Sequence, residues 1–160
     1  MIVAKLVGLS GSLRTASINM ALLRELSEYV PSHVSFEIVP LGHLPLFNPD
    51  LETDLPAVVA AFRLRIRAAD AFVIASPEYA HGISGVLKNA LDWLVADTGL
   101  LGKPVLVLNA APRAHHADDA LREILATMSA NVANCPAPVA ADIVRFLATL
   151  ARAEPALANE

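Results

Sequence analysis

A continuous apolar segment in the middle of the chain constrains the fold more than any other feature. Residues 71–75 read Ala-Phe-Val-Ile-Ala, with no polar side chain. A strand with one solvated face alternates apolar and polar residues, so a strand without polar residues is buried on both faces. Such a strand lies in the centre of a parallel sheet that helices cover on both sides. The segment therefore predicts an α/β protein.

Apolar segments on either side of residues 71–75 provide the other strands, and the stretches between them provide helices. The strands are expected at 2–9, 34–38 and 103–109. The helices are expected at 17–30, 56–69, 84–95 and 118–128. Near the C-terminus, 131–139 has the composition of an edge strand broken by Pro136 and Pro138, and 141–153 that of a last helix. Strands and helices thus alternate five times, which predicts a doubly wound parallel sheet in a single domain, residues 1–160.

The segment 56–69 allows two interpretations. Residues 62–67 read Phe-Arg-Leu-Arg-Ile-Arg, which is also the alternation of a strand. We expect a helix, because Pro56 suits a first helical turn and the segment has helical length. Arg63, Arg65 and Arg67 would then lie on the solvated side of that helix.

The composition limits where the protein works and what it binds. Apolar residues make up 55% of the chain, which suits a fully covered parallel sheet or further burial in an oligomer, but no run is long enough to span a membrane. The first residues lack the features of a secretion signal, and the single cysteine, Cys135, cannot form an internal disulfide. We therefore expect a cytoplasmic protein. The net charge of −4, without a basic patch, argues against nucleic acid as a partner.

A phosphate site is indicated near the N-terminus, where residues 6–19 read Leu-Val-Gly-Leu-Ser-Gly-Ser-Leu-Arg-Thr-Ala-Ser-Ile-Asn. An apolar strand leads through a hydroxyl-rich loop into a helix whose first N–H groups can bind an anion. Arg14 adds a bidentate donor for phosphate oxygens. The loop lacks both the P-loop Lys and the G-x-G-x-x-G pattern, so one phosphate of a mononucleotide fits best. The alternative is a structural loop in which Ser17 caps the helix and Arg14 is solvated.

A second informative loop follows the central strand. Residues 76–82 read Ser-Pro-Glu-Tyr-Ala-His-Gly, at the carboxyl end of a strand, where doubly wound sheets bind their ligands. Tyr79 and His81 offer planar surfaces to a flat heteroaromatic ring, and Gly82 and Gly85 allow close approach of the backbone. Ordinary loop packing would explain the two rings equally well.

Together the two loops resemble the NADPH-dependent FMN reductase family, which includes flavin-, quinone-, azo- and chromate-reducing enzymes. Residues 11–19 match its phosphate-loop pattern GSxRxxSxN, and residues 77–93 match PEYxxGxxGxLKNAxDW. GKPV at 102–105 and LREILATMSANV at 121–132 fit the same alignment. The resemblance covers residues 2–132, and two long motifs at matching positions make it specific.

The resemblance implies a flavodoxin-like, doubly wound five-stranded parallel sheet in the order 2-1-3-4-5, with helices on both faces. FMN would bind at the carboxyl ends of the strands. The residues assigned to its phosphate are Ser12, Leu13, Arg14, Ser17, Ile18 and Asn19. Those assigned to the isoalloxazine ring are Pro77, Glu78, Tyr79 and Gly82, with His81 nearby.

Members of this family are usually homodimers or homotetramers, and the helix at 84–95 is implied at the interface. Such an interface would account for the apolar residues Leu87, Leu91 and Leu94. For Trp93, which lies beside them, packing in the core or against a subunit is expected rather than contact with a ligand.

The implied activity is that of an FMN-dependent NAD(P)H oxidoreductase. In a ping-pong sequence, FMN takes a hydride from NADPH or NADH, and a small electron acceptor (a quinone, free flavin or azo compound) then uses the same face. One alternative is a flavodoxin-like electron carrier without NAD(P)H oxidase activity, although such carriers tend to be more acidic than −4. Another is a member that binds no flavin. The residues leave open the physiological acceptor, the choice between NADH and NADPH, and the choice between dimer and tetramer.

Two positions and one loop depart from the family pattern. Ala80 stands where many members have Asn, and Ser84 where many have Pro. The loop after the fourth strand, often Gly-rich, here contains Arg113, His115 and His116. We expect these three residues to be solvated in the loop rather than to contact flavin or an NADPH phosphate. The two histidines lack metal-ligand spacing with other Cys or His, so we expect no metal site.

Overall fold

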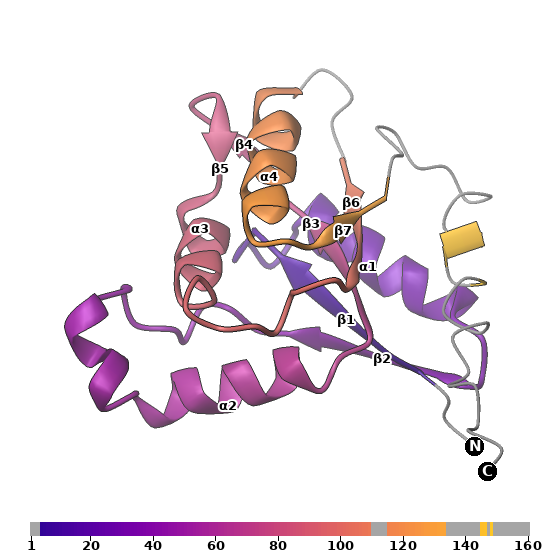
Figure 1. Ribbon diagram of the computed structural model, residues 1–160. Coiled ribbons are helices and arrows are strands. Elements are labelled where there is room, and N and C mark those ends of the chain that lie inside the picture. The colour runs from indigo at the N-terminus through magenta and orange to yellow at the C-terminus, as the bar shows by residue number, and fades with distance from the viewer. Residues whose placement is uncertain (1–3, 110–114, 134–144, 147, 149–160) are drawn as a thin grey trace, which may run out of the picture.

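The computed structural model describes residues 4–109, 115–133, 145, 146 and 148. A parallel sheet in the order β2-β1-β3-β6-β7 forms its centre (Figure 1). The strands are β1 (Ala4–Ser10), β2 (Val34–Val39), β3 (Ala71–Ala75), β6 (Pro104–Leu108) and β7 (Asn131–Val132). A separate antiparallel hairpin pairs β4 (Glu78–Tyr79) with β5 (Gly82–Ile83). The predicted flavodoxin-like sheet in the order 2-1-3-4-5 is confirmed.

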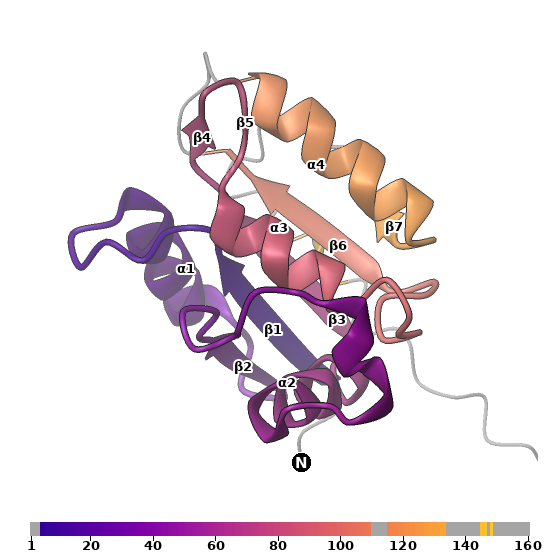
Figure 2. The same cartoon turned by 90° about the vertical axis from the view of Figure 1, so that its left-hand side faces the viewer.

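Helices cover both faces of this sheet, as Figures 1 and 2 show. They include α1 (Ile18–Tyr29), α2 (Ala57–Arg67), α3 (Gly85–Asp92) and α4 (His115–Thr127), with the short 3-10 helix η1 (Pro49–Thr53) before α2. The helix α1 packs on one face, and α2, α3 and α4 pack on the other. No helix within the described residues is both long enough and apolar enough to cross a bilayer.

Neighbouring side chains of β3 enter two separate cores. Val73 belongs to the core on the α1 side, together with Leu23. Phe72 belongs to the core on the opposite side, together with Ile66 of α2 and Leu91 of α3. All five residues of the strand are buried. Burial on both faces is the physical reason that residues 71–75 carry no polar side chain.

All four helices differ from their predicted bounds, and α3 and α4 differ by as much as three residues at one end. The helix α4 begins at His115 rather than at 118, because the Glu78 carboxylate accepts the N–H of Ala117 at 3.0 Å and satisfies a donor in the first turn. The helix α3 ends at Asp92 rather than at 95, and the chain continues in turns beyond Trp93.

The predicted fifth strand is confirmed, but only over the two residues of β7. Asn131 N–H donates to the Lys103 carbonyl at 2.9 Å, and Ala133 N–H donates to the Val105 carbonyl at 2.8 Å. The remainder of that predicted strand, 134–139, lies outside the described residues. Of the predicted helix at 141–153, positions 145, 146 and 148 are helical and the others lie outside the described residues.

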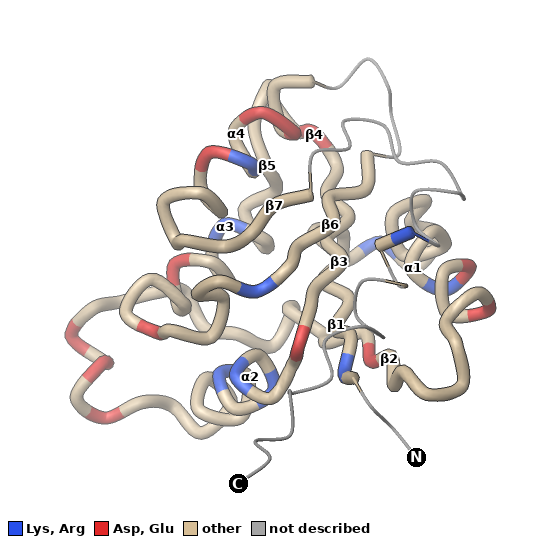
Figure 3. Tube along the Cα trace, turned by 45° about the vertical axis from the view of Figure 1, so that its right-hand side comes forward, with Lys and Arg blue, Asp and Glu red and all other residues tan. Residues whose placement is uncertain are grey.

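The helix α2 carries the cationic cluster of the chain (Figure 3), and the expectation that all three arginines face solvent is wrong for Arg63. Its side chain is 7% exposed, and Nε donates to the Trp93 carbonyl at 2.8 Å. Its two terminal nitrogens donate to the carboxylate of Glu52 at 2.9 and 2.7 Å. A buried guanidinium needs such partners, and nothing in the local pattern indicates that Glu52 is one. Arg65 and Arg67 are about half exposed, as expected.

The apolar face of α3 is covered by the chain itself. Leu87, Leu91 and Leu94 are at most 1% exposed and belong to the core shared with α2 and α4. The core of the chain itself therefore accounts for these apolar residues, without a subunit interface. Trp93 is also fully buried in this core, which confirms packing as its role.

The long loop between β2 and α2 is attached to α3. Trp93 Nε1 and Asn89 Nδ2 both donate to the carbonyl oxygen of Pro45, at 2.8 and 3.0 Å. The amide oxygen of Asn89 accepts the N–H of Phe47 at 2.8 Å, and the Phe47 ring meets the Trp93 ring edge-on, with centroids 5.0 Å apart. Two residues of the PEYxxGxxGxLKNAxDW segment thus position the loop rather than a ligand.

Candidate cofactor site

A cavity of about 330 Å³ lies at the carboxyl end of the sheet and brings the two predicted loops together. Its volume is within the range of small-molecule sites, about 300–1,000 Å³. Residues that follow β1, β3 and β6 form its wall: Ser12, Arg14, Ala16, Ser17, Ile18, Asn19, Ser76, Pro77, Glu78, Tyr79 and Asn109. The loops are separated by more than fifty positions in the chain, and the parallel sheet places them side by side.

Two buried serines, Ser12 and Ser17, line one half of this cavity. Ser17 is the N-cap of α1, and its Oγ accepts the N–H of Met20 at 3.2 Å. The Oγ of Ser12 accepts the N–H of Arg14 at 3.4 Å. Because each hydroxyl oxygen is used as an acceptor, its O–H is left as a donor for a ligand. Ser17 therefore does cap the helix, as the structural alternative for this loop expects, and this role is compatible with an anion site.

Arg14 and Asn19 add a cation and an amide to the same half. Arg14 is exposed, and within the described residues no carboxylate lies at ion-pair distance from it. Asn19 is 7% exposed, and its buried Oδ1 has no hydrogen-bond partner in the described structure. A buried amide oxygen without a donor is costly. This half of the cavity therefore fits a ligand that carries both an anion and hydroxyl donors, as the ribityl phosphate of FMN does.

Gly11 holds the two loops in contact. Its N–H donates to the Ala75 carbonyl at 2.8 Å. A Cβ at this position would lie 2.8 Å from Ser84 Oγ, 2.9 Å from Ser76 Oγ and 3.1 Å from Pro77 Cδ. A side chain cannot fit between the loops, which explains the glycine of the phosphate-loop motif.

The other half of the cavity is formed by the segment that follows β3. Pro77, Glu78 and Tyr79, which the sequence assigns to the ring, line it. The rim is apolar, since Tyr79 is 52% exposed and Ile18 on the opposite loop is 69% exposed. Such surfaces suit a planar heteroaromatic ring with one face accessible from solvent.

Three predicted site residues do not line the cavity. Leu13 is exposed and lies against Gly42 of the following loop. Gly82 pairs with Tyr79 in the hairpin, and His81 lies at its tip. A Cβ at Gly82 would meet no other described protein atom nearer than 3.7 Å, and one at Gly85 none within 4 Å, so contacts within the described structure do not require glycine at either position.

Sequence reasoning missed three residues of the cavity wall: Ala16, Ser76 and Asn109. Ser76 and Asn109 each follow directly on an apolar strand, β3 and β6. Because those strands are parallel neighbours, their carboxyl ends meet at the same edge of the sheet. The position of Ser76 and Asn109 directly after a strand is therefore the sequence signal that indicates these two residues.

A cluster of three histidines lies next to Glu78, outside the cavity wall. The His81 ring meets the His116 ring edge-on, with centroids 4.4 Å apart, and the rings of His115 and His116 are 4.0 Å apart. His115 and His116 belong to the first turn of α4 rather than to a loop, and both are exposed, as expected. In the part of the chain that the structure describes, no three His, Cys, Asp or Glu residues are arranged to hold a metal ion. Arg113 lies outside the described residues.

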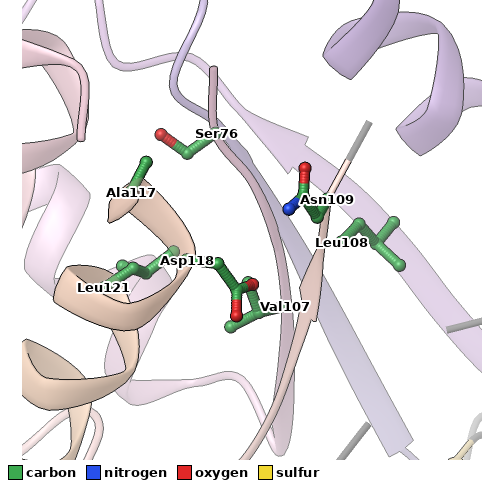
Figure 4. Close-up of a pocket in the computed structure, with 7 residues that line it drawn as sticks. All are labelled: Ser76, Val107, Leu108, Asn109, Ala117, Asp118 and Leu121. Carbon is green, nitrogen blue, oxygen red and sulfur yellow. The ribbon is translucent and has the colours of Figure 1, made fainter. Parts of the chain in front are cut away.

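A second space of about 10 Å³ adjoins the main cavity, and Figure 4 shows it between β6 and α4. Ser76 and Asn109 border both spaces. Asp118 points into the smaller one from α4, and its buried Oδ1 has no hydrogen-bond partner in the described structure. The volume is that of one water molecule.

The comparison with known families agrees with this geometry. The sequence model of the family described as NADPH-dependent FMN reductase matches residues 4–143. The chain belongs to this family. The match includes both loops of the cavity, so the NADPH-dependent FMN reductase motifs and the structural site coincide.

Curated relatives carry related names. The chain is 43% identical over 110 residues to the NAD(P)H-dependent FMN reductase PA1204 of Pseudomonas aeruginosa, an alignment that covers 67% of this chain and 60% of the relative. It is 38% identical over 144 residues to a quinone reductase of Escherichia coli, which covers 82% and 74% of the two proteins. Among solved structures, FerB of Paracoccus denitrificans, a flavoenzyme NAD(P)H:(acceptor) oxidoreductase, superposes with a TM-score of 0.78 at 27% identity over 94% of both chains. The chain spans about half to three fifths of the length of the first relatives it matches.

Proposed function

We propose that this chain is an FMN-dependent oxidoreductase that takes electrons from NAD(P)H and delivers them to a small acceptor, with quinones, free flavin and azo compounds as the candidate classes. The cavity carries this proposal, because it joins the hydroxyl-rich loop after β1 to the segment with Pro77 and Tyr79 after β3. The names of the relatives support both the cofactor and the acceptor class.

The residues present fit FMN. Arg14 and the hydroxyls of Ser12 and Ser17 would hold the phosphate, and the helix dipole of α1 adds to the attraction. Asn19 would accept a hydrogen bond from a ribityl hydroxyl through its unpaired Oδ1. When bound, FMN supplies the hydride chemistry, accepting from NAD(P)H and returning electrons to the acceptor in ping-pong order.

On the side of the ring, the chain supplies orientation and access. Pro77 and Tyr79 would border the isoalloxazine from one loop, and Ile18 would border it from the other. Because Tyr79 and Ile18 are more than half exposed, the nicotinamide and the acceptor would reach the same open face in turn. An open apolar rim selects planar acceptors by shape rather than by hydrogen bonds, which favours a broad range of quinones.

The first experiment is a visible spectrum of the purified protein, followed by addition of NADPH without oxygen. Bound flavin absorbance that bleaches within seconds is the expected result. Flavin that stays yellow would favour the alternative of an electron carrier reduced by a partner protein. A protein that stays colourless after reconstitution with FMN would contradict the proposal. Initial rates with varied NADPH and benzoquinone test the ping-pong order, for which parallel reciprocal plots are expected.

The remaining expectations concern the state of the protein. We propose that residues 1–160 form a single FMN-binding domain and that the protein works in the cytoplasm. We also propose a homodimer or homotetramer through residues 84–95. The exposed apolar side chain of Val95, which is 68% exposed at the end of that segment, supports this proposal. Analytical ultracentrifugation of wild type and Val95→Asp tests this interface. The mass of the Val95→Asp species is expected to be lower than that of wild type, and equal masses would contradict the interface.

A further inference from the structure

We propose that Glu78 is a positioning residue, which fixes the ring-binding wall by tying the β4–β5 hairpin to the N-terminus of α4. This inference rests on the proposed function, because the wall in question is the one assigned to the isoalloxazine. The role differs from the direct ring contact that the family resemblance implies for Glu78.

Both carboxylate oxygens of Glu78 face the protein. Oε2 accepts the N–H of Ala117 at 3.0 Å, and Oε1 lies 3.6 Å from Nδ1 of His81. The side chain is only 15% exposed. A carboxylate at the N-terminus of a 13-residue helix gains from the helix dipole as well as from the hydrogen bond. The contact joins segments that are 39 positions apart.

The hairpin needs such external support. Its ladder consists of two residue pairs, Glu78 with Ile83 and Tyr79 with Gly82, and a two-stranded hairpin of this kind is marginal by itself. Its two turn residues, Ala80 and His81, have φ angles of 49° and 59°. That left-handed region is unfavourable for side chains other than Gly, Asn and Asp. Contacts outside the hairpin must therefore select this conformation, and Glu78 provides a charged one.

The consequence for ligand binding is confined to one half of the cavity. Pro77, Glu78 and Tyr79 form the ring wall and belong to the hairpin segment. The anion half is built by the β1–α1 loop, whose hydrogen bonds do not involve Glu78. Loss of the carboxylate is expected to loosen the ring wall and leave the anion half intact.

The test compares FMN affinity and inorganic phosphate affinity in apo-protein variants. Glu78→Ala is expected to weaken FMN binding about tenfold or more, which is the size of effect expected for a lost charge-assisted hydrogen bond. Glu78→Gln keeps an oxygen that can accept the Ala117 N–H but loses the charge, so its FMN affinity is expected between those of wild type and Glu78→Ala. Phosphate protection against thermal unfolding is expected to be the same in all three proteins. Asn48→Ala is the matched control: it removes a side-chain cap of η1, on Asp50 N–H, away from the cavity wall, and is expected to leave FMN affinity unchanged.

A second readout follows the contact itself. Hydrogen exchange at the Ala117 amide is expected to be fast in Glu78→Ala and slow in wild type and Glu78→Gln. Glu78→Asp, which keeps the charge but shortens the side chain, is expected to behave like Glu78→Ala, and it serves if the alanine variant does not fold. Wild-type FMN affinity in both truncating variants, or an equal loss of phosphate and FMN binding, would overturn the inference. Failure of the wild-type protein to bind FMN would instead refute the proposed function, while the exchange data would still report on the tie between Glu78 and α4.

Discussion

Replacement of Gly11 by Ala is expected to separate the two loops of the cofactor site. The new Cβ would lie 2.8 Å from Ser84 Oγ, 2.9 Å from Ser76 Oγ and 3.1 Å from Pro77 Cδ. The proline ring is rigid, so relief must come from the serines or from movement of the loop. Ser84 cannot rotate freely, because its Oγ caps α3 by accepting the N–H of Leu87 at 3.2 Å.

The magnitude follows from these contacts. Loss of an N-cap costs about 1 kcal/mol, and insertion of a methyl group into a packed site costs about 1–3 kcal/mol. We expect Gly11→Ala to lower the free energy of unfolding by about 2–3 kcal/mol. For a domain of this size that corresponds to a decrease in Tm of roughly 4–12 °C. FMN binding should weaken as well, since Ser12 is the next residue.

Urea unfolding, together with FMN titration, measures both effects. Gly85→Ala is the control, because a Cβ there meets nothing within 4 Å, so stability should be unchanged or raised. In a Ser84→Ala background, Gly11→Ala should cost about 1 kcal/mol less, since the cap is already lost and its oxygen is gone. Strictly additive effects, or a Gly11→Ala protein as stable as wild type, would refute this account of the glycine.

Three further predictions concern stability. Ser129 has a φ of 58° after the end of α4, where Ala130 N–H donates to the Leu125 carbonyl at 3.0 Å. Because this left-handed conformation favours glycine, Ser129→Gly should raise the free energy of unfolding in urea by about 1 kcal/mol, and a decrease would argue against strain at this position. Arg63→Ala should cost about 3 kcal/mol because it leaves the Glu52 carboxylate without its bidentate partner, whereas the half-exposed Arg65→Ala should change stability by less than about 0.5 kcal/mol; equal effects would contradict the burial argument. Burial lowers the pKa of Lys103 from 10.5, against the opposing effect of Asp70 and Asp97, so the unfolded chain holds this proton more tightly than the folded one. The stability of wild type relative to Lys103→Met should then rise as the pH increases through the folded pKa towards 10.5, and a constant or falling difference between the two urea curves would contradict this sign.

The fold could be predicted because its signals are local. Five consecutive apolar residues indicate that β3 is buried on both faces. The consecutive pattern from Ser12 to Asn19 indicates the anion loop. Each of these segments would have the same structure in any parallel sheet of this order. The order itself followed from the resemblance to a family rather than from the residues alone.

The parts that escaped prediction depend on contacts between distant segments. The start of α4 depends on Glu78, 39 positions away from Ala117. The burial of Arg63 depends on Glu52, which the loop before α2 brings over the helix. Asn109 enters the cavity wall only because β6 pairs with β3. No periodicity within one segment contains this information.

The way in which the loop before α2 is attached determines which substitutions the loop can accept. Its two anchors, Asn89 Nδ2 in α3 and Trp93 Nε1 directly after this helix, both donate to the carbonyl oxygen of Pro45. Every amino acid offers that oxygen, so the loop keeps its anchorage whatever side chains it displays. Leu46, next to the anchor, is 84% exposed and contributes little to the core. Side chains on this surface beside the phosphate loop can therefore be substituted, in evolution or in a mutant library, without loss of the hydrogen bonds that hold the loop.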